Sequence, residues 1–149
     1  MKFIEWDLAY SVGLSEIDGE HKTLMNLLNE AIHNSSGNKE KERIFFDKKI
    51  DKIIEFIEIH YKTEEQYLSK SNYGKYNEHI FEHEYILKII QKIKDDIINN
   101  KMEIDLFNIT AHLREVFLNH IKFYDKSAKV YFLEGKNEHN GNKDKKSTR

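Results

Sequence analysis

Histidine and acidic side chains recur at fixed spacings in four separate stretches of the sequence. Together these stretches supply five histidines and two carboxylates: His21, His60, Glu64, His79, His83, His120 and Asp125. His79 and His83 lie four residues apart in HIFEH, a spacing that places both imidazoles on one face of an α-helix. The histidines also fall on the apolar stripes of their predicted helices, where an unpaired polar group is costly. The pattern therefore indicates a buried metal site.

The number of candidate ligands indicates two metal ions rather than one. Five imidazoles and two carboxylates exceed the coordination of a single ion, but they suit two ions if both carboxylates bridge. With one bridging solvent oxygen, a metal with three histidines has six ligands and a metal with two histidines has five. The second metal keeps an open position, and we expect a pocket there for a small apolar molecule such as dioxygen. The predicted lining of this pocket is Leu24, Ile57, Val116 and Phe117.

Composition predicts a single cytoplasmic domain around this site. A chain of 149 residues is long enough for one sizeable core and too short for two. The 24 basic and 26 acidic side chains nearly balance, so we expect neither nucleic acid nor an anionic membrane as a partner. The absence of cysteine excludes disulfides and thiolate ligands. Glu5 and Asp7 interrupt the N-terminal stretch, so it does not resemble a secretory signal.

Helical periodicity predicts an all-α fold, and proline is absent from the chain. The predicted helices cover residues 18–33, 39–69, 75–98 and 104–124, and NSSGN at 34–38 should end the first of them with Gly37 in the left-handed conformation. Short connections between four helices predict an antiparallel up-down-up-down bundle, preceded by an irregular N-terminal arm. We expect the domain to cover residues 1–133. The polar stretch 134–149 has no apolar side chain, and we expect a disordered tail.

The spacing between His120 and Asp125 does not fit a regular α-helix. Positions five apart differ by about 140° around an ideal helix, so the two side chains should not face the same point. We therefore predict that the helix widens locally or ends between them, in a π-type turn of the kind found at functional sites.

Two other metal-site patterns occur in the chain. HIFEH also satisfies the H-x-x-E-H signature of the inverted zinc peptidases, with Glu82 as base, but that signature belongs to an α/β scaffold. A ferritin-like di-iron oxidase needs two E-x-x-H motifs, and only EAIH at 30–33 clearly falls in a predicted core helix. Neither reading uses the full set of histidines. His112 and His139 have no motif partners, so we interpret the first as a packing or surface residue and the second as part of the tail.

The chain resembles the hemerythrin family, in particular the single-domain bacterial hemerythrins. The resemblance rests on WDLAYSVGLSEIDGEHKTL at 6–24 and on HYKTEE, HIFEH and HIKFYD, in the order H, HxxxE, HxxxH, HxxxxD. It implies a non-haem centre of two iron ions, one held by three histidines and the other by two. The implied ligands are His79, His83 and His120 on the first iron, His21 and His60 on the second, and Glu64, Asp125 and a solvent-derived oxygen as bridges.

The resemblance also implies a function. We expect reversible dioxygen binding at the iron of His21 and His60, for oxygen storage, delivery or local supply, and we do not expect an enzyme. The alternatives are an oxygen or redox sensor, or a protective di-iron protein that acts on peroxide or nitric oxide or handles iron. A protein that receives the oxygen is a further expected partner. In the family an aromatic residue, often phenylalanine, follows the histidine of the second helix; here Tyr61 joins the predicted oxygen pocket, where its phenol could donate a hydrogen bond or a proton.

Overall fold

The computed structural model describes the backbone of residues 1–147 and the side chains of residues 1–138, 140 and 141. Within this described part every regular element is helical. The elements in chain order are the 3₁₀ turn η1 (Leu8–Tyr10), α1 (Ser15–Asn34), α2 (Lys39–Ser69), α3 (Tyr76–Ile98), α4 (Leu106–His120), the π-helical segment η2 (Ile121–Asp125) and α5 (Lys126–Ser147). None of the described helices is both long and apolar enough to cross a membrane.

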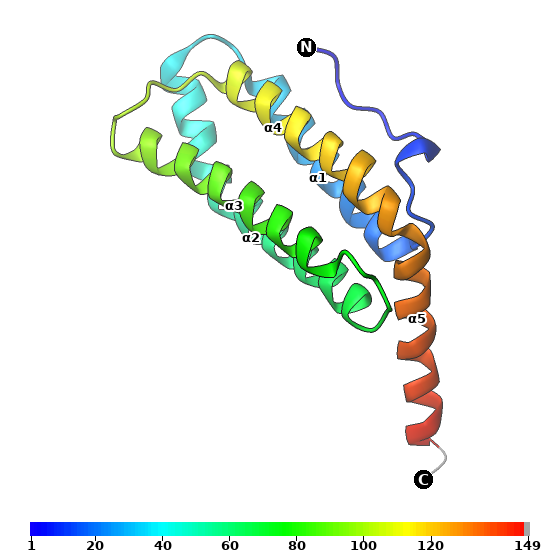
Figure 1. Cartoon of the computed structure of the whole chain (residues 1–149). Coiled ribbons are helices and arrows are strands. Elements are labelled where there is room, and N and C mark those ends of the chain that lie inside the picture. The colour runs from blue at the N-terminus through cyan, green and yellow to red at the C-terminus, as the bar shows by residue number, and fades with distance from the viewer. Residues whose placement is uncertain (148–149) are drawn as a thin grey trace.

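Helices α1 to α4 form an antiparallel up-down-up-down bundle, and an irregular arm precedes α1 (Figure 1). The predicted fold class is therefore confirmed. The fourth helix of the bundle extends further than predicted, because η2 continues α4 directly into α5. Helix α5 packs against the end of α2 and then extends beyond the bundle (Figure 1).

Local sequence sets the ends of the bundle helices. The side chain of Asn38 accepts a hydrogen bond from the backbone N–H of Lys41 at 3.0 Å and so caps the start of α2. Asp105 caps α4 in the same way, with the N–H of Asn108 at 3.0 Å. Gly37 has a φ of +73°, the left-handed conformation predicted for the turn between α1 and α2. These short-range contacts explain why the helices begin and end close to their predicted bounds.

A buried carboxylate, Glu42, joins two connecting segments at one end of the bundle. Its Oε1 accepts a hydrogen bond from the backbone N–H of Gly37 at 2.7 Å, and its Oε2 accepts one from the N–H of Leu106 at 3.1 Å. Hydrogen bonds to a charged acceptor are stronger than neutral ones. Glu42 therefore fixes the α1–α2 turn to the start of α4, at the end of the bundle away from the predicted ligands.

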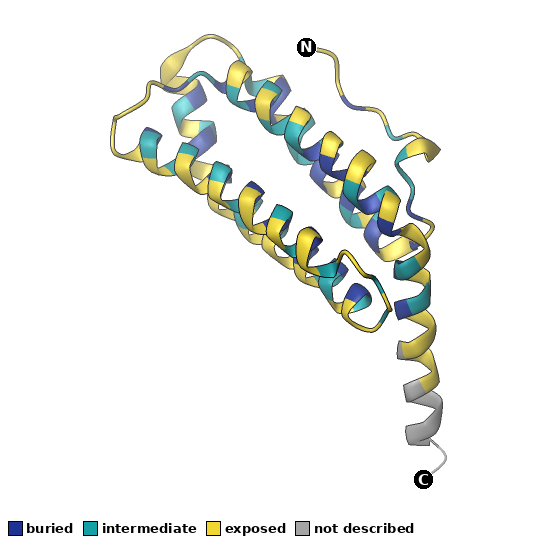
Figure 2. Cartoon of the chain, viewed as in Figure 1, coloured by how far each residue is buried: buried dark blue, intermediate teal, exposed yellow. Residues whose placement is uncertain are grey.

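Two apolar clusters fill the interior of the described part, and buried positions alternate with exposed ones along the bundle helices (Figure 2). The larger cluster runs along the bundle and includes Leu24, Phe46, Ile57, Tyr61, Ile90 and Phe117. The smaller cluster lies where α5 meets the starts of α1 and α3 and the end of α2: Val12, Leu14, Ile17, Leu68, Ala128 and Phe132.

The predicted ligands lie between these two clusters. On α1, His21 is one turn beyond Ile17 of the smaller cluster and one turn before Leu24 of the larger cluster. On α2, Glu64 occupies the corresponding position between Tyr61 and Leu68. Apolar packing on both sides therefore separates this layer of polar side chains from water.

Helix α5 continues past residue 133, where composition predicted the start of a disordered tail. Gly135 is buried, and a Cβ at this position would overlap the backbone carbonyl of Tyr67, so the absence of a side chain lets α5 approach the end of α2. The carboxylate of Glu134 accepts a hydrogen bond from the N–H of Asn72 at 3.0 Å. The helix extends into these polar residues because its earlier turns are already packed in place, so each added residue avoids the free-energy cost of helix nucleation. Residues 148 and 149 of the predicted tail lie outside the described residues.

Candidate metal centre

The structure brings all seven predicted ligands together inside the bundle. The contributions are His21 from α1, His60 and Glu64 from α2, His79 and His83 from α3, His120 from α4 and Asp125 from η2. None of these residues is more than 1% exposed. Their ligand atoms form two groups, within each of which all atoms lie within 4.8 Å of one another. We call His79, His83 and His120 the three-histidine group, and His21 and His60 the two-histidine group.

The carboxylate of Glu64 faces both groups at once. Its Oε1 lies 3.1 Å from Nε2 of His60 and 3.4 Å from Nε2 of His21. Its Oε2 lies 2.9 Å from Nε2 of His83 and 3.1 Å from Nε2 of His79. Each oxygen of this carboxylate therefore faces one histidine group.

Asp125 has the same relation to the two groups. Its Oδ2 lies 3.1 Å from Nε2 of His21, whereas its Oδ1 lies 3.0 Å from Nε2 of His120 and 3.3 Å from Nε2 of His79. Both histidine groups thus share the same two carboxylates.

The π-helical segment η2 explains how Asp125 reaches the cluster. The backbone N–H of Lys126 bonds to the carbonyl of Ile121, five residues earlier, in place of the usual four. This wider turn brings residues five apart onto one side of the helix. The predicted π-type turn between His120 and Asp125 is confirmed, and Asp125 is fully buried rather than exposed to solvent.

Several polar atoms of the cluster are buried without a hydrogen-bond partner. They include Nε2 of His21 and of His60, Oε1 of Glu64 and both carboxylate oxygens of Asp125. These atoms lie close together but are not aligned for hydrogen bonds with one another. Burying unpaired polar atoms in an apolar interior destabilises the fold unless a cation binds to them. The donor set, made of imidazole nitrogens and carboxylate oxygens, fits a non-haem metal site.

The carboxylates and imidazoles of the cluster shift one another's pKa values. Burial would lower the pKa of His60, but the carboxylates of Glu64, Glu20 and Asp125 together outweigh burial and raise the pKa to about 9. Burial would also lower the pKa of His120, but the carboxylates of Asp125 and Glu64 together raise that pKa to about 10. Burial would raise the pKa of Glu64, yet the imidazoles of His60, His120 and His21 together hold that pKa well below its usual range. The metal-free cluster therefore keeps protons on these imidazoles at neutral pH, and a metal ion must displace them.

Two carboxylates outside the cluster contact its histidines, and sequence reasoning missed both. The Oε2 atom of Glu20 lies 2.7 Å from Nδ1 of His60, and its Oε1 accepts a hydrogen bond from the hydroxyl of Thr63 at 3.0 Å. The Oε1 atom of Glu65 lies 2.9 Å from Nδ1 of His83. Carboxylates in this position fix the ring orientation and raise the basicity of metal-bound histidines. The signal in the sequence was their position directly beside a predicted ligand, Glu20 before His21 and Glu65 after Glu64.

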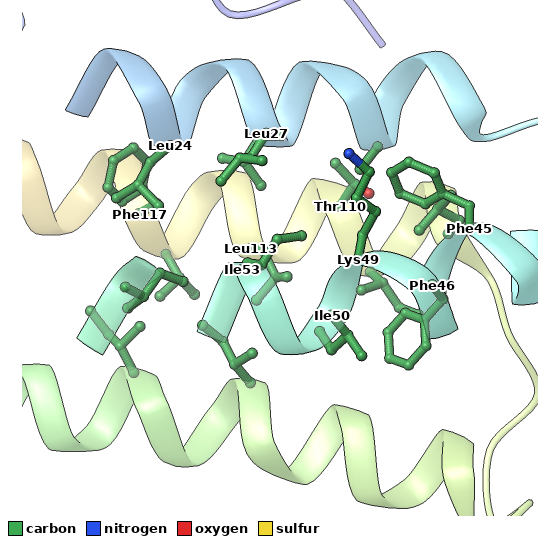
Figure 3. Close-up of a pocket in the computed structure, with 18 of the residues that line it drawn as sticks. Leu24, Leu27, Phe45, Phe46, Lys49, Ile50, Ile53, Thr110, Leu113 and Phe117 are labelled. Carbon is green, nitrogen blue, oxygen red and sulfur yellow. The ribbon is translucent and has the colours of Figure 1, made fainter. Parts of the chain in front are cut away.

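All five predicted pocket residues line one apolar cavity of about 60 Å³: Leu24, Ile57, Tyr61, Val116 and Phe117. Figure 3 shows Leu24 and Phe117 at one end of this cavity and Phe45, Phe46 and Lys49 at the other. The ring of Phe117 meets His21 edge-on, with 5.9 Å between ring centroids. The cavity is therefore adjacent to the two-histidine group and is large enough for a small apolar molecule.

The residues that only the two rival patterns would use, Glu82, Glu30 and His33, lie outside the cluster. Glu82 is only partly buried and belongs to neither group of ligand atoms among the described residues. Glu30 and His33 of EAIH are exposed on α1, and His112 is exposed on α4. The side chain of His139 lies outside those that the structure describes. The geometry thus favours neither the peptidase nor the ferritin-like reading.

The fold and the cluster together define an all-α bundle with a histidine-rich, non-haem metal site. Residues 12–129 match the model of the hemerythrin HHE cation binding domain. Because this match covers most of the chain, the protein belongs to the hemerythrin family.

Named relatives and solved structures agree with this assignment. The chain is 24% identical to a bacteriohemerythrin of Methylococcus capsulatus over 127 residues, which cover 85% of this chain and 94% of the relative. It is 29% identical to a bacteriohemerythrin of Clostridium acetobutylicum over 93 residues, which cover 58% and 67% of the two chains. The crystal structure of wild-type hemerythrin superposes with a TM-score of 0.76 at 22% identity, covering 88% of this chain and 98% of the other. At that identity the superposition shows the shared fold.

Proposed function

We propose that this protein binds dioxygen reversibly at a non-haem centre of two iron ions. One observation carries the proposal: two groups of buried histidines share the same two carboxylates, beside an apolar cavity of about 60 Å³. Two metal ions would explain why both histidine groups share the same carboxylates. The size and apolar lining of the cavity suit a small apolar ligand.

In this proposal the three-histidine group holds one iron and the two-histidine group holds the other. Glu64 and Asp125 would bridge the ions, since each turns one oxygen toward each group, and a solvent-derived oxygen would be the third bridge. The first iron then has six ligands and the second has five. Dioxygen would bind at the second, which His21 and His60 hold. When bound, the two ions supply the electrons that retain dioxygen and take them back on release.

The chain itself supplies a dry and weakly anionic environment. The rings of Tyr61 and Phe117 and the side chains of Leu24, Ile57 and Val116 line the cavity next to the two-histidine group. They exclude water and favour a small apolar molecule over a polar one. The ligand set is rich in neutral imidazole and contains only two carboxylates, so it stabilises highly oxidised iron less than a carboxylate-rich set would. Both properties favour binding and release over oxidation of a substrate.

The same site could also serve as an oxygen or redox sensor, or in protection against peroxide or nitric oxide, or in iron handling. Contacts of Tyr61 and Tyr124 with the three-histidine group favour the peroxide alternative, because phenols are oxidised readily. An oxygen carrier and these alternatives differ in whether the iron-loaded protein is oxidised reversibly or irreversibly in air.

Metal analysis coupled to an anaerobic reduction and reoxygenation titration tests the proposal. We expect two irons per chain and an optical spectrum that cycles between a deoxygenated and an oxygenated form. A chain that binds one iron or none would contradict the di-iron centre. Rapid and irreversible oxidation on first contact with air would contradict the carrier and support the sensor or protective role.

A further inference from the structure

Two tyrosines stack on imidazoles of the three-histidine group. Tyr61 lies parallel to His83, with 3.8 Å between ring centroids and 6° between ring planes. Tyr124 lies nearly parallel to His120, at 5.4 Å and 12°. Tyr61 is buried in the bundle, whereas Tyr124 is partly exposed. Oxidisable rings therefore contact two ligands of the group that we propose to hold the six-coordinate iron.

A third tyrosine connects the same group to the surface. Tyr73 lies in the turn between α2 and α3, which reaches the side of α5 (Figure 1). Its ring meets His79 edge-on with 6.3 Å between centroids, and it lies 4.7 Å from the ring of Tyr131 on α5. Tyr73 and Tyr131 are both partly exposed. The three rings form a continuous path from a buried imidazole to solvent.

The path opens beside a surface depression of about 270 Å³. His79 forms part of its wall, together with Tyr73, Tyr124 and the charged residues Lys75 and Glu78. Its polar lining differs from that of the apolar cavity on the other side of the cluster. A small polar oxidant such as hydrogen peroxide can therefore approach the three-histidine group from this side, where Tyr73 and Tyr124 lie.

We propose that Tyr73 and Tyr131 are an oxidative modification site, at which peroxide chemistry of the metal centre ends in a covalent dityrosine link. This inference rests on the proposed function, because it requires a redox-active metal beside His79. Overall, hydrogen peroxide takes one electron and one proton from each phenol and is reduced to two molecules of water. The two tyrosyl radicals then couple, forming one carbon–carbon bond between ring carbons ortho to the oxygens. Each coupled carbon then gives up its proton, the carbonyl oxygen of the same ring gains one, and both phenols are restored; the pair has lost two hydrogens in all.

This site would give the protein a second activity, the removal of peroxide at the expense of its own tyrosines. The ring separation of 4.7 Å places the two reacting rings in contact before oxidation. The link would also join the α2–α3 turn to α5 covalently. We therefore expect the oxidised protein to unfold at a higher temperature than the untreated protein, provided that both are compared with metal bound.

Peptide mapping of the iron-loaded protein after treatment with hydrogen peroxide tests the inference. Trypsin releases Tyr73 in SNYGK and Tyr131 in VYFLEGK. We expect these peptides to appear joined, with a mass two hydrogens below their sum and with dityrosine fluorescence. The metal-free protein under the same treatment should yield at least tenfold less of the joined peptide. Equal yields with and without iron would overturn the inference, since mere proximity would then explain the link.

Three variants sharpen the test. Tyr73→Phe and Tyr131→Phe should each abolish the joined peptide, while Tyr85→Phe, which changes an exposed tyrosine of α3, should leave its yield unchanged. In Tyr131→Phe a tyrosyl radical should remain detectable by electron paramagnetic resonance, because Tyr73 then has no coupling partner. A chain that binds no iron would overturn both this inference and the proposed function. A chain that binds iron and oxygen but forms no link would overturn this inference alone.

Discussion

The carboxylate of Glu20 lies 2.7 Å from Nδ1 of His60, on the side of the ring opposite the nitrogen that faces Glu64. The next residue along the chain, His21, belongs to the same two-histidine group. One dipeptide of α1 therefore supplies a candidate ligand and also orients the other histidine of that group. Through this contact Glu20 supports the two-histidine group without being one of its candidate ligands.

Glu20→Gln should weaken metal binding at the two-histidine group by about 10- to 100-fold. The amide keeps the size of the side chain and an acceptor oxygen, but it removes the charge that makes His60 a stronger base. Metal titration of the purified variant measures the effect. Glu30→Gln is the matched control, since Glu30 lies on the same helix and pairs with Lys49, away from the cluster. Identical titrations for the two variants would show that Glu20 does not support the site.

His79→Ala and Glu64→Ala should reduce metal occupancy to different extents. The first removes one of three histidines from one group, whereas the second removes a carboxylate that both groups share. We therefore expect a greater loss of metal from Glu64→Ala. Metal content per chain and the optical spectrum measure this loss, with His112→Ala on the surface of α4 as the control. If either variant kept two irons and an unchanged spectrum, our ligand assignment would be wrong.

Metal affinity should rise with pH between about pH 6 and pH 9. In the metal-free protein the pKa values of His60 and His120 are raised to about 9 and about 10, so protons compete with the metal below these values. Calorimetric titration in buffers of different ionisation enthalpy should detect proton release on metal binding at pH 7. An affinity that does not change across this range would contradict the predicted competition.

The same pKa shifts predict how the stability of the metal-free protein depends on pH. A histidine whose pKa is raised by folding stabilises the folded state most below its unfolded value of 6.5. This stabilisation is lost as the pH rises through about 9 for His60 and about 10 for His120. We therefore expect the melting temperature of the metal-free protein to fall between pH 7 and pH 10. The metal-loaded protein should not show this fall, because its imidazoles bind metal instead of protons.

Gly135→Ala should destabilise the protein by about 1–3 kcal/mol, the usual cost of overpacking. The added Cβ would overlap the carbonyl of Tyr67, so α5 must move away from α2. Gly141→Ala is the control, since a Cβ at Gly141 meets nothing within 4 Å and alanine favours a helix more than glycine does. Denaturant unfolding of both variants measures the free energy difference. If Gly135→Ala were as stable as Gly141→Ala, α5 would not approach the end of α2 this closely.

Much of the candidate site followed from the sequence because its signals are local. The separations of His60 from Glu64 and of His79 from His83 match one helical turn, so helix geometry alone places each pair on one face. The five-residue separation of His120 and Asp125 does not match a turn, so two ligands at these positions required the helix to widen or end between them, and the structure contains a π-helical segment there. Caps and turn residues such as Asn38 and Gly37 act within a few positions, so they fix the helix ends in the same local way.

Composition was less informative about residues 134–147, which the structure continues as helix. Gly135 contributes by having no side chain next to Tyr67, and the sequence around it does not show which distant carbonyl it approaches.

The sequence by itself determined the four bundle helices, the order of the histidines and acids along them, and the departure from α-helical geometry before Asp125. Only the tertiary structure decided which side chains meet across helices. Glu20 of α1 reaches His60 of α2, and Tyr73 of the α2–α3 turn reaches Tyr131 of α5, because of how these elements pack. Such contacts depend on the rotation and spacing of helices relative to one another. Packing of the whole core fixes those quantities, and no local spacing in the chain records them.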